Sequence, residues 1–164
     1  MSSWFRTHGY ASVDERLIVG SLPLDEADVR MLAALGVSRV LNLVEDREYG
    51  RGERRKVERA LATEGIVELR LSTADYAGLA AELLDQATAQ VNSWLDAGEI
   101  VYLHCRAGWQ RSVAVAAGAI ALRHGIAPAA ALQRVRELKP SADPLPQQRQ
   151  DLQRWFAARP PRGT

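Results

Sequence analysis

The chain has 164 residues, of which 47% are hydrophobic and 25% are charged. This length and balance predict one compact domain and exclude an intrinsically disordered chain. The formal net charge of +1 excludes a strong overall field toward nucleic acid, so affinity for anions must come from a local site.

Short apolar runs alternate with stretches of helical spacing along the chain. In chain order they predict a strand at 17–19, a helix at 25–35, a strand at 40–44, a helix at 53–64, a strand at 66–71, a helix at 79–95, a strand at 100–103 and helices at 112–125, 128–139 and 146–158. This alternation predicts a single-domain α/β fold, in which a central, mainly parallel sheet of four to five strands is flanked by helices on both faces. We expect a domain spanning 1–164, with a core at about 15–157 and a frayed tail at 159–164.

Cys105 is the single cysteine, so no internal disulfide can form and the fold does not depend on an oxidising compartment. No apolar run reaches the roughly 18 residues of a membrane span. Residues 1–10 lack the apolar core of a secretory signal. We therefore expect a cytoplasmic protein without a membrane span.

Residues 45–59 carry six basic and five acidic side chains. Mixed charge of this kind is typical of a solvated loop and helix face. Alternatively, Arg47, Arg51 and Arg54 belong to a substrate-facing loop that meets a phosphate or an acidic peptide.

Residues 104–112, with the sequence His-Cys-Arg-Ala-Gly-Trp-Gln-Arg-Ser, connect the most apolar strand to a helix. In an open parallel sheet, ligands bind beyond the carboxyl ends of the strands. A short loop that leads into a helix also presents backbone N–H groups and the positive end of the helix dipole. The position of this loop therefore predicts an anion site.

Three side chains in the loop predict phosphate chemistry. Cys105 lies at its start, where the helix terminus and nearby cations should hold it as the nucleophilic thiolate. Arg111 lies six positions later (111 − 105 = 6), so a curled loop can bring its guanidinium to two phosphoryl oxygens. Gly108 lets the backbone bend inward.

The pattern His-Cys, five residues, Arg-Ser, with glycine three positions after the cysteine, resembles the signature of protein tyrosine phosphatases. The short chain resembles the dual-specificity branch, and residues 17–23 and 36–43 resemble the family's first two strands. The resemblance covers about 15–157 and implies the cysteine-phosphatase fold. It also implies hydrolysis of phosphotyrosine, and with dual specificity of phosphoserine and phosphothreonine, through a phosphocysteine intermediate without a cofactor.

The resemblance implies roles for three further residues. Asp75 lies thirty positions before Cys105 (105 − 75 = 30), where the family carries its general acid; alternatively it caps a helix beginning near Tyr76. His104 would orient the loop and help to keep the thiolate, and Ser112 would donate a hydrogen bond to the cysteine sulfur. Without the signature, these two would be read as a buried imidazole and a helix cap.

The predicted substrate-binding residues are Arg106, Ala107, Gly108, Trp109, Gln110 and Arg111. Relatives that act on phosphoinositides tend to carry two basic residues between the cysteine and the arginine, whereas Arg106 is the only one here. Trp109 either shapes the pocket rim or packs under the loop. Gln148 resembles a glutamine that positions the attacking water in some relatives, although the adjacent Gln147 leaves this assignment ambiguous.

We predict a phosphorylated protein or peptide as substrate, with a phosphoinositide or small phosphorylated metabolite as the alternative. A phosphopeptide-binding module without catalysis is the alternative from another class. A sulfur-transfer enzyme is disfavoured, because its loop usually lacks Arg and Ser at these spacings. We expect no metal, since His8, His104 and His124 show no ligand spacing.

Overall fold

Five strands form one sheet in the computed structural model, which describes residues 1–160. They are β1 (Tyr10–Asp14), β2 (Leu17–Gly20), β3 (Arg39–Asn42), β4 (Val67–Arg70) and β5 (Val101–His104). Their order is β1-β2-β5-β3-β4; β1 is antiparallel to β2 and the other pairs are parallel. This confirms the expected mainly parallel sheet, while residues 161–164 of the expected frayed tail lie outside the described residues.

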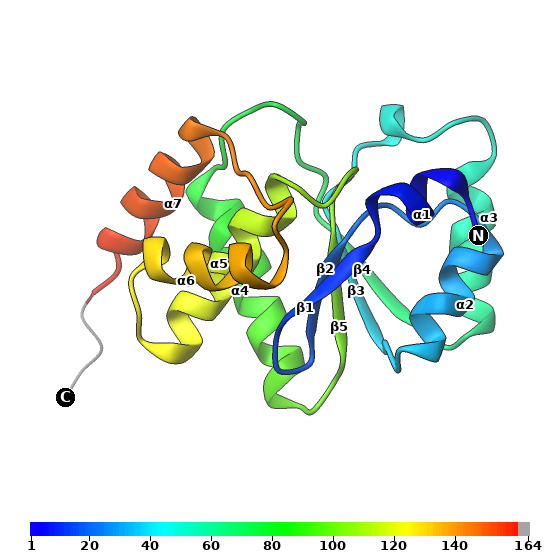
Figure 1. The fold of residues 1–164 in the computed structure, drawn as a ribbon, viewed down its shortest axis with the longest axis horizontal. Coiled ribbons are helices and arrows are strands. Elements are labelled where there is room, and N and C mark those ends of the chain that lie inside the picture. Colours follow the sequence, from blue (N-terminus) through cyan, green and yellow to red (C-terminus); the bar gives the residue numbers. More distant parts are fainter. Residues whose placement is uncertain (161–164) are drawn as a thin grey trace.

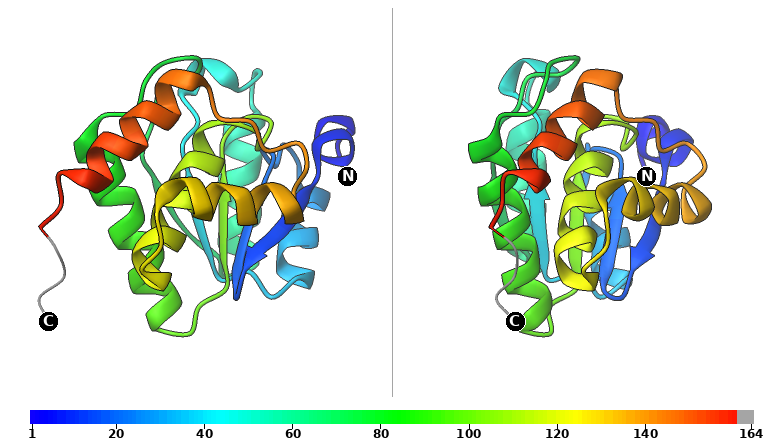
Figure 2. Two further views of the ribbon diagram at one scale, coloured as in Figure 1. Left: turned by 60° about the vertical axis from the view of Figure 1, so that its left-hand side comes forward. Right: turned by 90° about the vertical axis from the view of Figure 1, so that its left-hand side faces the viewer.

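Helices cover both faces of this sheet (Figure 1). They are α1 (Ser3–His8), α2 (Glu26–Ala34), α3 (Glu53–Thr63), α4 (Ala81–Asp96), α5 (Arg111–His124), α6 (Pro128–Leu138) and α7 (Pro146–Ala157), with a short 3₁₀ helix, η1 (Asp46–Glu48). One face carries α2 and α3, and the other carries α4 to α7, with α7 alongside α4 (Figure 2).

The central strand β5 contributes to two separate hydrophobic clusters. Val101 and Leu103 pack with residues of α4 to α7, whereas Tyr102 packs with residues of α1, α2 and α3. Successive side chains of a strand point to opposite faces, so a strand covered on both faces must be apolar throughout. This explains the uninterrupted apolar run, and it places the loop after β5 at the centre of the sheet edge.

The N-terminal residues contain two elements that the sequence did not predict, α1 and β1. In β1 only Val13 is buried, so the strand shows no clear apolar alternation. The short helix α1 has a single buried residue, Phe5, and is tied to α2 because the Ser2 backbone N–H donates to Asp28 Oδ1 at 2.8 Å. Their placement depends on contacts that are distant in sequence.

The remaining helices begin and end within about two residues of their predicted limits. The interpretation of Asp75 as a cap of a helix near Tyr76 is wrong, because α4 begins at Ala81 after an irregular segment. Within residues 1–160, no helix alone has the length and apolar character for a membrane span; only α5 and α6 together, bent by 118°, meet that test.

Candidate active site

The loop between β5 and α5 is fixed against the end of β2. Leu22 N donates to the Arg106 carbonyl at 3.0 Å. Gly108 has a φ of +76°, and a Cβ there would lie 2.6 Å from the Gly20 carbonyl, so this close approach requires glycine. Within residues 1–160, the amides of residues 106–110 donate to no backbone carbonyl. These amides are therefore not used by the backbone of the protein, as an oxyanion site requires.

Cys105 lies buried at the start of this loop, next to the N-terminal turn of α5. Its Sγ is 3.1 Å from the Oγ of Ser112, the second residue of the helix. A hydroxyl in this position can donate to a sulfur anion. The structure therefore brings together these two predicted residues.

Arg111 has a side chain that is only 1% exposed. Its Nη1 and Nη2 donate to the two carboxylate oxygens of Glu48, at 2.9 and 2.6 Å, and Nη1 also donates to the Thr73 carbonyl at 2.8 Å. The Nη edge of the guanidinium is thus held by the protein, whereas the buried Nε makes no hydrogen bond among the described residues.

Glu48, at the end of η1, is the functional residue that sequence reasoning missed most clearly. Burial alone would raise its pKa, but hydrogen bonds from Arg111 and the Glu45 backbone, with the charges of Arg111 and Arg106, lower it below its ordinary value. In turn, the raised pKa of Arg111, despite its burial, reflects the bond to Glu48. The two side chains form a charged pair that fixes the guanidinium.

Asp75 lies in the irregular segment 71–80 that connects β4 to α4. Its Oδ1 is 3.3 Å from Arg111 Nη2 and accepts the Tyr76 N–H at 3.1 Å. The side chain is partly exposed at the mouth of the site. This position allows the carboxyl to exchange protons with a group bound above Cys105 and with solvent.

His104 is buried at the end of β5. Its Nδ1 is 3.0 Å from the Cys105 carbonyl, and its Nε2 has no partner in residues 1–160. Burial lowers the pKa of the imidazole to about 4. The ring is therefore neutral near pH 7, and the carbonyl assigns the proton to Nδ1.

A cavity of about 310 Å³ brings together Cys105, Arg111 and Asp75. It is lined by Trp4, His8, Asp75, Tyr76, Cys105, Arg106, Ala107, Trp109, Gln110 and Arg111. Of the six predicted substrate-binding residues, only Gly108 is missing from the lining, because it faces Gly20. Trp109 is 41% exposed and forms part of the rim. In the part of the chain that the structure describes, no group of three or more His, Cys, Asp or Glu residues is placed to hold a metal ion.

The N-terminal helix supplies an aromatic wall that the sequence did not predict. Trp4 donates through Nε1 to the Arg106 carbonyl at 2.8 Å, and the Arg106 guanidinium lies 4.8 Å from the centre of its ring. The ring of His8 lies 4.0 Å from that of Trp4 and 5.2 Å from that of Trp109. Only the folded chain brings α1 to the loop, so no local pattern could have indicated this wall.

The charged segment 45–59 contributes differently from the substrate-facing alternative. Arg47 pairs with Glu45, and Arg54 pairs with Glu68. Neither they nor Arg51 lines the cavity. The segment instead supplies Glu48, which reaches Arg111.

Gln148 lies away from the cavity lining, in the first turn of α7. It is fully buried, its Oε1 accepts the Leu145 N–H at 3.0 Å and its Nε2 donates to the Ala77 carbonyl at 3.1 Å. Both ends of the amide are therefore engaged within the protein.

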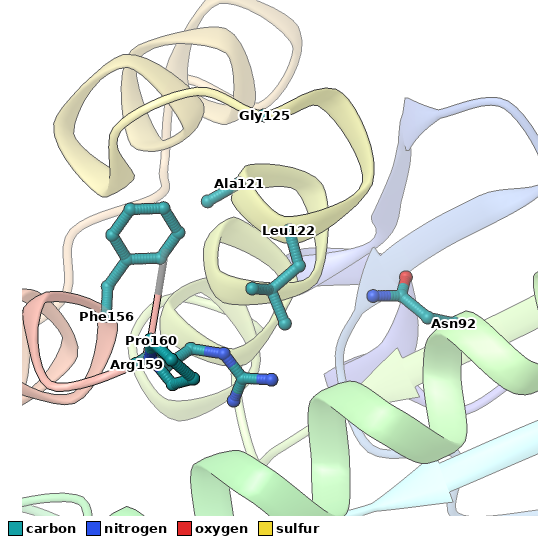
Figure 3. Close-up of a pocket in the computed structure, with 7 residues that line it drawn as sticks. All are labelled: Asn92, Ala121, Leu122, Gly125, Phe156, Arg159 and Pro160. Atoms are coloured by element: carbon teal, nitrogen blue, oxygen red, sulfur yellow. The ribbon is translucent and has the colours of Figure 1, made fainter. Parts of the chain in front are cut away.

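A second cavity, of about 520 Å³, lies between α4, α5 and the end of α7 (Figure 3). It is lined by Asn92, Ala121, Leu122, Gly125, Phe156, Arg159 and Pro160. Arg159, its only charged lining residue, pairs with Asp85. Without a nucleophile or proton donor for phosphate chemistry, this cavity is not the candidate active site.

The family model described as "Swiss Army Knife protein, DSP-PTPase phosphatase domain" matches residues 11–159. The chain therefore belongs to this family, and it is a phosphatase of the dual-specificity type. Phosphatidylglycerophosphatase and protein-tyrosine phosphatase 1 of Rattus norvegicus is 25% identical over 147 residues, which cover 89% of this chain and 75% of that protein. The protein of the same name from Mus musculus gives the same values.

Solved structures share this fold. The crystal structure of PTPMT1 has a TM-score of 0.78 at 24% identity, covering 90% of this chain and 94% of that chain. Tk-PTP in its active form has a TM-score of 0.79 at 22% identity, covering 92% and 97%. Human DUSP28 has a TM-score of 0.71 at 24% identity, covering 91% and 93%. At these identities the likeness establishes the architecture.

Proposed function

We propose that this phosphatase hydrolyses phosphotyrosine side chains of proteins or peptides through a phosphocysteine intermediate. The observation that carries the proposal is the convergence of Cys105, Arg111 and Asp75 on one cavity with aromatic walls. A phenyl ring stacks favourably on such walls, whereas a bare phosphate gains nothing from them.

In the first step, the Cys105 thiolate attacks phosphorus. The sulfur–phosphorus bond forms while the bond to the tyrosine oxygen breaks, and protonated Asp75 gives its proton to the departing phenolate. The amides of residues 106–110 and Arg111 Nε hold the non-bridging oxygens. Positioning and preorganised charge supply most of the acceleration.

In the second step, water attacks the phosphocysteine. The Asp75 carboxylate takes the proton of this water, the sulfur–phosphorus bond breaks and inorganic phosphate leaves. The Ser112 hydroxyl, 3.1 Å from the sulfur, stabilises the thiolate that departs. His104 holds the loop backbone through the Cys105 carbonyl.

A phospholipid headgroup is the second candidate substrate. It is favoured by the rodent relatives, whose name includes a phosphatidylglycerophosphatase, over 89% of this chain. The argument against a lipid is that Arg106, the only basic residue between Cys105 and Arg111, is already engaged by other residues of the protein. Its guanidinium lies over Trp4, and its Nη1 donates to the Glu48 carbonyl at 2.6 Å. We therefore place phosphotyrosine first.

Four substrates test this order: a phosphotyrosine peptide, a phosphothreonine peptide, a phosphoinositide and phosphatidylglycerophosphate, the lipids in vesicles. We expect the highest kcat/KM for the phosphotyrosine peptide, and a higher value for either lipid would overturn the substrate class. Cys105→Ser should lower turnover by at least about 10³-fold while peptide binding persists. Hydrolysis at the wild-type rate by this variant would overturn the mechanism.

A further inference from the structure

The segment 71–80, which carries Asp75, is held to the phosphate site at its first half. Thr73 N donates to the Leu43 carbonyl, beyond the end of β3, at 3.0 Å. The Thr73 carbonyl accepts the Arg111 Nη1–H at 2.8 Å. The chain is thus fixed two residues before Asp75.

The second half of the segment is held by α7. Gln148 Nε2 donates to the Ala77 carbonyl at 3.1 Å, two residues after Asp75. Asp151 Oδ2 accepts the Leu79 N–H at 2.9 Å. Gln148 and Asp151 are three residues apart on the helix, so they present one face to the segment.

Gln148 and Asp151, which we call the clamp, are themselves held in place by hydrogen bonds. Gln148 Oε1 accepts the Leu145 N–H, which leaves its NH₂ group to face the segment. Gln147 donates to Asp151 Oδ1 at 2.9 Å. A Cβ at Gly78 would lie 2.6 Å from Asp151 Oδ2, so a side chain at that position would displace the carboxylate that accepts the Leu79 N–H. These contacts form a specific interface between the segment 71–80 and α7.

We propose that Gln148 and Asp151 are positioning residues that hold Asp75 where it protonates the leaving group. The inference rests on the proposed function. Only residues 74–76 lie between the anchors at Thr73 and Ala77, so the position of Asp75 follows from both. General acid catalysis is sensitive to distance, and a misplacement of about 1 Å can cost about 10²-fold in rate. In this assignment Gln148 acts on the first step, not on the attacking water.

Leaving-group dependence tests the proposal. We compare kcat/KM for a phosphotyrosine peptide with that for an aryl phosphate whose strongly acidic phenol needs no protonation. Gln148→Ala and Asp151→Ala should each lower the value for the peptide by about tenfold, part of the 10²–10⁴-fold that acid catalysis supplies, and the other value by less than about threefold. Asp151→Asn, which keeps an acceptor for Leu79, should restore the peptide value.

Gln150→Ala is the matched control, because this glutamine lies in the same helix but is exposed. It should leave both substrates unchanged. Equal losses on both substrates in Gln148→Ala and Asp151→Ala would indicate general structural damage and overturn the proposal. A lower kcat with unchanged kcat/KM would indicate a role in the second step, as expected of a water-positioning glutamine, and would also overturn it.

Asp75→Asn separates this inference from the proposed function. It should show a larger leaving-group dependence than either clamp variant. If it shows none, the assignment of the general acid fails. If Asp75→Asn shows the dependence but Gln148→Ala and Asp151→Ala do not, the proposed function stands and the clamp alone is refuted. Asp151 is partly exposed, so its substitution tests the clamp even if Gln148→Ala does not fold.

Discussion

The phosphate loop, residues 105–111, and the acid segment, residues 71–80 with Asp75, both line one cavity, but different interactions hold them. The loop is fixed by backbone: Leu22 donates to the Arg106 carbonyl, and Gly108 touches the Gly20 backbone. The second half of the acid segment depends on hydrogen bonds from single side chains of α7, each worth about 1 kcal/mol. The anion site is therefore preorganised by the fold, whereas the position of the acid can be changed by single substitutions.

Among the substitutions that test this comparison, Gly108→Ala should have the largest effect, because it disrupts the rigid phosphate loop. The new Cβ would lie 2.6 Å from the Gly20 backbone, so the loop must move and its N–H groups would no longer point at the phosphate oxygens. Loss of one such oxyanion contact costs about 10²–10³-fold. We expect kcat/KM to fall by at least that factor, with weaker inhibition by vanadate.

Gly98→Ala is the control for the glycine substitution. Gly98 has a φ of +83°, so it carries the same left-handed strain, but a Cβ there meets nothing within 4 Å. It should lower stability by about 1 kcal/mol and leave kcat/KM unchanged. Similar activity losses in the two variants would show that contact with Gly20 does not matter.

The free energy of unfolding should depend on pH through His104, the residue that precedes the phosphate loop. Its folded pKa is about 4, because burial opposes the charge, against 6.5 for the ordinary group. Between these values the unfolded chain binds more protons, so stability rises with pH and is lost as pH falls from 6.5 to 4. This displacement of the pKa corresponds to about 3 kcal/mol of unfolding free energy.

Urea unfolding between pH 7 and 4 checks this loss, and His104→Gln should flatten the profile. The lowered pKa values of Glu48 and Glu68 act in a different interval. A carboxylate with a depressed pKa stabilises the fold above the ordinary 4.5, and its contribution is lost only as pH falls below that value. An unchanged profile in His104→Gln would show that the imidazole is not buried as a neutral group.

The contrast between the phosphate loop and the acid segment also explains what the sequence could predict. The phosphate loop could be predicted because strand, loop, Cys105, Arg111 and helix are contiguous in the chain. The sequence separation from Cys105 predicts Asp75, but the residues of α7 that hold its segment lie 71 and 72 positions from their partners Ala77 and Leu79. Trp4 reaches the cavity and Glu48 reaches Arg111 only in the folded chain, and neither belongs to a local pattern.

Glu48→Gln should loosen the guanidinium that links the two walls. A neutral amide replaces the carboxylate that accepts from both Arg111 Nη atoms, so the buried cation loses one of its two counter-charges and keeps only Asp75, at 3.3 Å. We expect a loss of about 2 kcal/mol in unfolding free energy and about a tenfold lower kcat/KM. Glu58→Gln, which removes an exposed pair with Arg54, should cost less than about 0.5 kcal/mol and no activity. Equal effects in the two variants would contradict a special role for Glu48.

Tyr76→Ala, in the acid segment, should give the smallest effect. Tyr76 is 77% exposed and lines the cavity next to Asp75. Stacking on a substrate ring is worth about 0.5–1.5 kcal/mol, so KM for a phosphotyrosine peptide should rise by about two- to tenfold while kcat is kept. A phosphothreonine peptide has no ring, and its KM should not change. If both substrates lose equally, Tyr76 supports the segment rather than the substrate, and the acid segment would then depend on its own side chains as well as on α7.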